Sequence, residues 1–233
     1  MDASDADKTL AELGAKPSPS EEHGLSLIRD EDKMIFSPGI STAGFAEIRM
    51  VRQHPDRKVV ATTIDREGLA RAEEIITSLG LQGQIETRLE DLRGAWNYPR
   101  EYFDFIYARL VLHYLSVQDL EVALKNFTRS LKSGGRIFVV VRSVKNVTAS
   151  DPHVRFDPDT KLTTYPHYDA SGALLSTNVR YFHTPESIRT HIEGAGLKVD
   201  SIEEYQEQLY RDFMRRDMSP HTDHVIELVA TKF

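Results

Sequence analysis

Two glycines in the segment KMIFSPGISTAG, Gly39 and Gly44, occupy the first and last glycine positions of a G-x-G-x-x-G turn. Ser41 stands at the middle position. Glycine allows a tight turn and a close approach of ligand to backbone, and the first amides of a following helix attract anions. The spacing alone fits a ligand-free glycine turn equally well, so its interpretation depends on the surrounding residues.

Carboxylates follow the next two strand patterns. Asp65 ends the run VVATTID, and Glu90 and Asp91 lie in RLEDL. A carboxylate at the first position can accept both hydroxyls of a ribose, and one at the second can accept from an exocyclic amine. The structural alternative is a helix cap at Asp65, followed by Arg66 and Glu67, and a turn or cap acid at Asp91.

A cation and a histidine follow the fourth strand pattern, FDFIYA. Arg109 and His113, in ARLVLHYL, are expected at the ligand-binding edge of a parallel sheet, where they are candidates for proton transfer or substrate contact. A buried histidine that supports its own loop is the competing interpretation of His113. We expect Tyr114 to pack.

Residues 143–182 lack a regular hydrophobic period and are rich in proline, turn formers and aromatic side chains. Such a stretch inside a compact fold is typical of a lid or a small subdomain. Its aromatic and histidine side chains suit an apolar or aromatic substrate whose hydroxyl or amine must be oriented; alternatively, they pack the lid onto the sheet. The candidate substrate-binding residues are His153, Tyr165, His167 and Tyr181.

Strand and helix patterns alternate from Lys33 onward, which predicts a parallel, doubly wound α/β sheet that binds ligands at the carboxyl ends of its strands. Two further strand patterns, LKVDSIEEYQ and HVIELVATKF, close the chain. The other predicted strands are Lys33–Phe36, Val59–Ile64, Gln84–Leu89, Phe103–Ala108 and Arg136–Val141. The predicted helices are Ala43–Gln53, Glu67–Leu79, Val117–Leu131 and one beginning after Thr184.

Composition narrows the function classes. The 233 residues carry a net charge of −7 and no cysteine, which excludes disulfides, thiolate metal sites and cysteine nucleophiles and disfavours a nucleic-acid partner. No other residue set predicts a metal site. Without a long apolar run or a signal-peptide pattern, we expect a cytoplasmic protein with no membrane contact. Residues 1–22 form an acidic extension with a Pro/Ser linker, and residues 23–233 form the domain.

Several segments together resemble the class I S-adenosylmethionine-dependent methyltransferases. VVATTID resembles the second motif of that family and RLEDL the third, while EYFDFIYARLVLHYLSVQDLEVALKNFTRSLKSGGRIFVVVRS is similar to the block from the fourth to the fifth strand. YFHTPESIRTHIEGAGLKVDSIEEY looks like the helix and strand that follow the family's substrate insertion. The resemblance implies a mostly parallel seven-stranded sheet with an antiparallel last strand, helices on both faces and an insertion after the fifth strand.

The resemblance also implies S-adenosylmethionine as cofactor and a small-molecule acceptor methylated at oxygen or nitrogen. It leaves the oligomeric state open, a homodimer included. The cofactor-binding residues it implies are Ser37, Gly39, Ser41, Asp65, Arg66, Asp91, Leu92 and Arg109.

The first motif departs from the family pattern. Family members carry an acid two residues before the first glycine, where this chain has Ser37, and further glycines where it has Ser41 and Ala43. The change removes a partner for the amino group of the cofactor. Two alternatives therefore stay open: a non-catalytic relative that binds cofactor weakly or not at all, and a nicotinamide-dependent oxidoreductase. No tyrosine precedes a lysine by four residues, so the short-chain dehydrogenase pair is absent.

Overall fold

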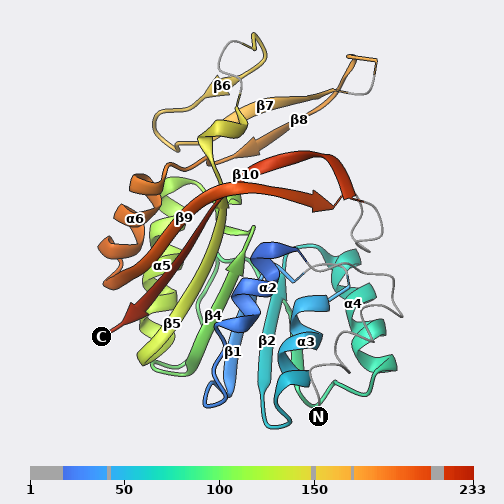
Figure 1. Ribbon diagram of the computed structural model, residues 1–233, viewed down its shortest axis with the longest axis vertical. Coiled ribbons are helices and arrows are strands. Elements are labelled where there is room, and N and C mark those ends of the chain that lie inside the picture. The colour runs from blue at the N-terminus through green and yellow to red at the C-terminus, as the bar shows by residue number, and fades with distance from the viewer. Residues whose placement is uncertain (1–17, 41–42, 148–150, 169–170, 211–217) are drawn as a thin grey trace.

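The computed structural model describes residues 18–40, 43–147, 151–168, 171–210 and 218–233. Within these residues the main sheet has seven strands, in the spatial order β3-β2-β1-β4-β5-β10-β9. All neighbouring strands are parallel except β10, which runs antiparallel to both β5 and β9 (Figure 1). The predicted doubly wound sheet with an antiparallel last strand is therefore confirmed.

The strands agree with the hydrophobic runs of the sequence to within a few residues, except that β5 begins at Leu131 and the last two strands are longer than predicted. Their bounds are β1 Met34–Pro38, β2 Lys58–Thr63, β3 Ile85–Leu89, β4 Phe103–Arg109, β5 Leu131–Arg142, β9 Leu197–Tyr210 and β10 Met218–Lys232. The central strands are buried on both faces, which explains why they read as continuous apolar runs.

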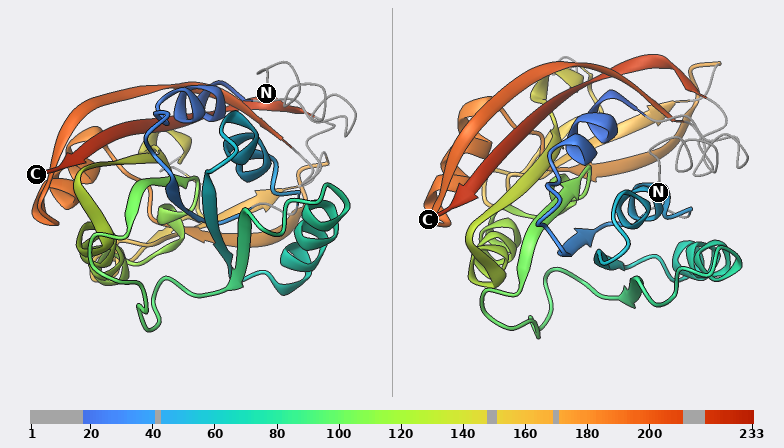
Figure 2. Two further views of the ribbon diagram at one scale, coloured as in Figure 1. Left: turned by 90° about the horizontal axis from the view of Figure 1, so that it is seen from below. Right: turned by 60° about the horizontal axis from the view of Figure 1, so that its bottom comes forward.

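Helices cover both faces of the sheet (Figure 2). One core cluster joins the sheet to α5 and α6, and a second joins it to α2, α3 and α4. The helices are α2 Pro19–Ser26, α3 Phe45–Gln53, α4 Arg66–Ser78, α5 Val117–Ser130 and α6 Pro185–Gly194, with short 3-10 turns η1 Leu112–Tyr114 and η2 Val144–Asn146.

Local signals in the sequence set the helix starts. Asp65 caps α4, Ser116 caps α5, and Thr184 caps α6 in a capping box with Ser187, with Pro185 at the first helical position. Buried apolar residues recur along α5 at helical spacing, which fixes the face that it turns to the sheet.

The insertion after β5 is a small antiparallel sheet of β6 (Arg155–Phe156), β7 (Thr163–Tyr168) and β8 (Leu174–Arg180). It lies beyond one end of the main sheet, at the top of Figure 1. At the other end of the described chain, the expected boundary at residue 22 falls inside α2. Ser18, Ser20 and Glu21 are fully buried, so this segment packs as part of the domain.

Candidate functional site

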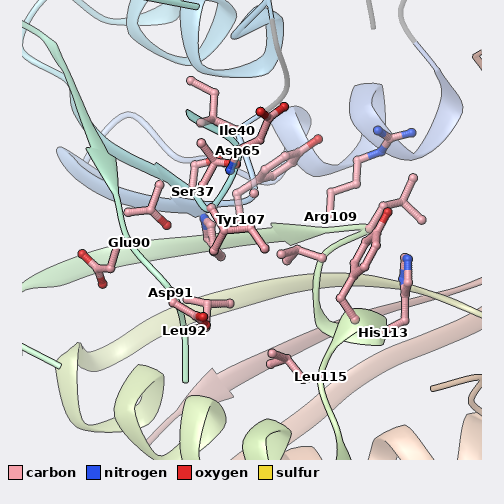
Figure 3. Close-up of a pocket in the computed structure, with 18 of the residues that line it drawn as sticks. Ser37, Ile40, Asp65, Glu90, Asp91, Leu92, Tyr107, Arg109, His113 and Leu115 are labelled. Carbon is pink, nitrogen blue, oxygen red and sulfur yellow. The ribbon is translucent and has the colours of Figure 1, made fainter. Parts of the chain in front are cut away.

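A pocket of about 580 Å³ opens where the first four strands end (Figure 3). This volume lies within the usual range for small-molecule sites, roughly 300–1,000 Å³. Its walls come from Ser37–Ile40, Thr62–Asp65, Glu90–Arg93 and most of Arg109–Leu115. The pocket therefore collects the carboxyl ends of β1, β2, β3 and β4, the edge at which ligands bind in doubly wound sheets.

The glycine turn joins β1 to α3. Gly39 has a φ of +83°, and a Cβ atom there would lie 2.9 Å from Val111, so both conformation and packing require glycine. The amides of Gly39 and Ile40 donate to the carbonyl of Thr62, at 2.7 and 2.9 Å. These two amides hold the turn against β2. The predicted Ser41 lies outside the described residues.

A buried carboxylate approaches the turn from helix α3. The Ser37 hydroxyl donates to Glu47 Oε1 at 2.6 Å, and Glu47 lines the pocket while only 3% of its surface is exposed. Sequence reasoning placed Ser37 in the site but missed Glu47. The one available signal was its place in the first turn of the helix that follows the glycine motif, where an acid is favoured in any case.

Asp65 combines the two roles considered for it. Its Oδ1 accepts from the amides of Glu67 and Gly68, at 3.1 and 3.0 Å, as the cap of α4. The same side chain lines the pocket beside Ile64, an apolar residue that is 68% exposed. Arg66, the first residue of α4, is exposed and does not line the pocket.

The end of β3 contributes two acids and an apolar side chain. Asp91 accepts from Arg93 Nη2 at 2.6 Å, and the hydrogen bonds from the Arg93 side chain hold the pKa of this carboxyl below its usual value. Glu90 Oε2 accepts from the hydroxyl of Tyr98 at 2.7 Å. Leu92 is buried and faces the pocket beside them. Acids and an apolar wall thus meet at this corner.

Arg109 lines the pocket, but its charged end is turned toward α2 (Figure 3). Its Nε donates to Ser20 Oγ and its Nη2 to Ser18 Oγ, both at 2.6 Å, and Glu207 Oε1 lies 3.6 Å from Nη2. The guanidinium therefore fastens the N-terminal helix to β9. The structure does not present it to the reacting end of a ligand.

His113 lies in η1 at the edge of the pocket and is 1% exposed. Burial, assisted by the charges of Arg142 and Arg180, lowers the pKa of His113 well below 6.5, so its ring is neutral at physiological pH. The ring stacks on Tyr114 with centroids 4.7 Å apart, and the His113 carbonyl accepts from the Tyr181 amide at 2.8 Å. These contacts match the loop-supporting alternative.

Of the four candidate substrate residues of the insertion, the three whose side chains the structure describes, His153, Tyr165 and Tyr181, do not line the pocket. Tyr181 is buried and bonds to His191 at 3.0 Å, Tyr165 packs on Phe182, and His153 is exposed beside Tyr168. His167 belongs to β7, and its side chain lies outside the description.

Besides the backbone bond from Tyr181 to His113, the side chain of Arg180 brings the insertion into contact with the pocket. Its guanidinium lies 3.8 Å from the ring centre of Tyr114, a pocket residue that is 54% exposed. The aromatic candidates thus do not converge on the site, whereas this cation does reach one of its walls.

The family model of a methyltransferase domain matches residues 38–139, the segment that carries the ends of β1, β2, β3 and β4 at the pocket. A solved S-adenosylmethionine-dependent methyltransferase from Methanosarcina mazei is 15% identical, with a TM-score of 0.68 over 89% of this chain and 95% of that one. The CcbJ methyltransferase from Streptomyces caelestis is 12% identical, with a TM-score of 0.68 over 95% and 92% of the two chains.

The strand order and these similar structures show that the chain has the Rossmann-like fold of the class I S-adenosylmethionine-dependent methyltransferases, and the methyltransferase model matches its residues 38–139. The same fold is also similar to that of the [4+2]-cyclase SpnF, at 15% identity and a TM-score of 0.60 over 97% of this chain and 80% of that one. No curated protein matches the sequence. Among the described residues, no helix is both long and apolar enough to cross a membrane.

Proposed function

We propose that this protein transfers a methyl group from S-adenosylmethionine to oxygen or nitrogen of a small-molecule acceptor. The observation that carries the proposal is the position of Asp65. Its carboxylate caps α4 through Oδ1 and still lines a pocket formed by four consecutive strand ends. A carboxylate held in this way is placed to accept the two hydroxyls of a ribose.

The neighbouring residues fit the adenosine part of this cofactor. Ile64 and Leu92 offer apolar surface to an adenine ring, and Glu90 and Asp91 offer carboxylate acceptors for its exocyclic amine. When bound, the cofactor supplies an activated methyl group on a sulfonium. The protein then has to align donor and acceptor and exclude water.

The pocket is poorly suited to a dinucleotide. Pyrophosphate binding relies on free amides at the glycine turn and on the positive end of the following helix. Here the amides of Gly39 and Ile40 are bonded to Thr62, and the Glu47 carboxylate lies in the first turn of α3. Because these two amides already have an acceptor, a pyrophosphate would have to displace it, which favours the methyltransferase over a nicotinamide-dependent oxidoreductase.

The acceptor side of the pocket supports a compact substrate. Val111, Tyr114 and Leu115 wall this end, and the neutral His113 lies among them. Because the pKa of His113 is lowered, the ring is a weak base, and orientation of the acceptor takes precedence over proton removal by this residue.

Calorimetric titration of the full chain with S-adenosylmethionine, S-adenosylhomocysteine and NAD tests the proposal. We expect the first two ligands to bind, NAD to give no binding heat, and Asp65→Ala to abolish binding. Binding of NAD alone would support the oxidoreductase. Absence of binding by all three at millimolar concentration would refute the enzymatic function and favour a non-catalytic relative.

A further inference from the structure

The guanidinium of Arg180 lies at the acceptor end of the pocket, where the insertion meets η1. It is 3.8 Å from the ring centre of Tyr114, which lines the pocket and is 54% exposed. We propose that Arg180 binds a carboxylate of the methyl acceptor, so that the substrate is a small carboxylic acid. The inference rests on the proposed function and names the substrate class of that same site.

Two strands bring arginines to the same turn. Arg142 is the last residue of β5 and Arg180 the last residue of β8, and both strands pack against η1, which contains His113. The Tyr181 amide donates to the His113 carbonyl at 2.8 Å, directly after Arg180 in the chain. The His183 amide donates to the Arg142 carbonyl at 2.9 Å. These bonds hold both arginines near His113, whose pKa is lowered by burial and then by their two charges.

The neighbouring charges are balanced, whereas that of Arg180 is not. Arg142 lies 2.5 Å from Asp223, and Lys145 lies 2.5 Å from Glu204. Across the residues that the structure describes, no aspartate or glutamate lies at ion-pair distance from Arg180. Three cations and two acids thus leave one positive charge around this turn, which favours an anionic group on the ligand.

The hydrogen-bond donors of Arg180 are also incompletely used. Its Nη1 donates to the carbonyl of Val179 at 2.7 Å, while its Nε is buried and has no acceptor in the described part of the chain. A buried donor without an acceptor costs free energy, so a missing partner is indicated there. A carboxylate suits a guanidinium because its two oxygens accept parallel N–H bonds in one plane.

His113 adds a second unpartnered polar group to the same place. It is 1% exposed and lines the pocket, and its Nδ1 has no hydrogen-bond partner among the described residues. In the tautomer with hydrogen on Nδ1, the neutral ring is a donor for a carboxylate oxygen. Val111, Leu115 and the exposed ring of Tyr114 offer apolar surface to the rest of such an acid.

Two probes that differ in charge test the assignment. Benzoate and benzamide have nearly the same size and shape, but benzoate alone carries a carboxylate. With S-adenosylhomocysteine present, we expect the wild-type full chain to bind benzoate roughly 10- to 100-fold more tightly than benzamide, as hydrogen bonds to charged groups allow. Arg180→Gln should bring this ratio close to one, with the loss confined to benzoate. Calorimetric titration measures both affinities.

Arg155→Gln is the matched control, because it removes the same charge from an exposed arginine of the insertion. It should leave the ratio of the two affinities unchanged. Arg180→Lys keeps the charge but loses the planar pair of donors, so it should lower the ratio severalfold. It also provides the test if thermal melting shows that Arg180→Gln does not fold.

The outcomes separate the two proposals. A wild-type preference for benzoate that disappears in Arg180→Gln and persists in Arg155→Gln supports the assignment. Equal binding of both probes, no binding of benzoate at millimolar concentration, or a preference that survives in Arg180→Gln overturns it. In those cases the proposed function stands if S-adenosylhomocysteine binds. Failure of S-adenosylhomocysteine to bind overturns the proposed function, and a benzoate preference that depends on Arg180 would then still support a carboxylate site.

Discussion

The two sides of the pocket that the proposed function assigns to cofactor and to acceptor are built in different ways. The cofactor side consists of carboxylates that follow successive parallel strands, among them Asp65 and Asp91, each held by local hydrogen bonds. The acceptor side consists of η1 and its contacts with the insertion, where His113 is buried and neutral and Arg180 covers Tyr114. The first side is set by the sheet and the second by packing between segments far apart in the chain.

This difference indicates which part of the pocket can change in evolution without disturbing the binding of the proposed cofactor. Strand ends are fixed relative to one another by the backbone hydrogen bonds of the sheet, so they suit a cofactor whose shape is constant. The insertion meets the pocket through a few side chains, so its sequence can change without moving Asp65. Function on such a fold resides in the site, as the likeness to both methyltransferases and a cyclase illustrates.

The largest expected effect is the loss of folding stability when Gly39 is replaced, measured against the same change at a glycine of the insertion. Gly39→Ala combines a left-handed backbone with a Cβ atom 2.9 Å from Val111 and should lower the free energy of unfolding by about 2–4 kcal/mol. Gly172, in the insertion, has a φ of +84° and open space around it. Gly172→Ala should therefore cost only the backbone strain, about 1 kcal/mol. Urea unfolding measures both, and equal losses would contradict the packing role of Gly39.

The second effect concerns ribose binding by Asp65. Asp65→Asn should weaken S-adenosylhomocysteine binding by roughly 10- to 100-fold, because it removes the charge that accepts the hydroxyls. Asparagine caps helices as well as aspartate does, so the melting temperature should hold. Calorimetry measures the affinity, with the exposed Asp56→Asn as control. Wild-type affinity in Asp65→Asn would show that the ribose lies elsewhere.

The third effect is a pH dependence of stability at the buried His183, which follows the insertion. Burial lowers the pKa of His183 to about 3, whereas the unfolded chain has a histidine pKa near 6.5. The unfolded state therefore binds this proton first. The stability due to neutral His183 is complete above about pH 6.5 and is lost progressively as the pH falls toward 3.

Urea unfolding between pH 7.5 and 5 measures this loss, which for one such histidine approaches about 1.4 kcal/mol per pH unit below 6.5. His183→Gln should reduce the slope, while His153→Gln, at an exposed histidine, should leave it as in the wild type. An unchanged slope in His183→Gln would mean that this ring is not buried in its neutral form.

The smallest expected effect is that of substitutions in the insertion on the affinity for the cofactor product. His153→Ala and Tyr165→Phe lie outside the pocket lining, so both should leave the affinity for S-adenosylhomocysteine within about twofold of wild type, as surface changes away from a site do. Calorimetric titration measures this. A tenfold loss of affinity for S-adenosylhomocysteine in either variant would mean that the insertion contacts the cofactor, which would contradict the distinction between the two sides.

The sequence predicted the sheet well because its strands are buried on both faces and appear as uninterrupted apolar runs. A residue directly after such a run could also be placed at the pocket, as Asp65 was, because the run marks where the strand ends. The place of Glu47 in the pocket was missed because its contact with Ser37, ten positions earlier in the chain, depends on how α3 packs against β1. No spacing rule in the sequence marks that contact.

The contacts of the candidate residues Arg109 and Tyr181 could not be read from the sequence either, because Arg109 bonds to residues much earlier in the chain and Tyr181 to a residue of α6. Arg109 is the last residue of β4, one position beyond the end that the sequence predicts, but its guanidinium bonds to Ser18 and Ser20, which precede it by 91 and 89 positions. Tyr181 appeared to be a substrate contact by residue type, whereas α6 encloses it with His191 in the core. Aromatic composition alone does not separate a lid that packs from a lid that binds.

The most direct test of the central claim is a crystal structure of the full chain with S-adenosylhomocysteine. We expect the ribose hydroxyls at hydrogen-bond distance from Asp65, with adenine beside Ile64 and Leu92. A ligand bound outside the pocket, or one whose ribose lies away from Asp65, would contradict the proposed function.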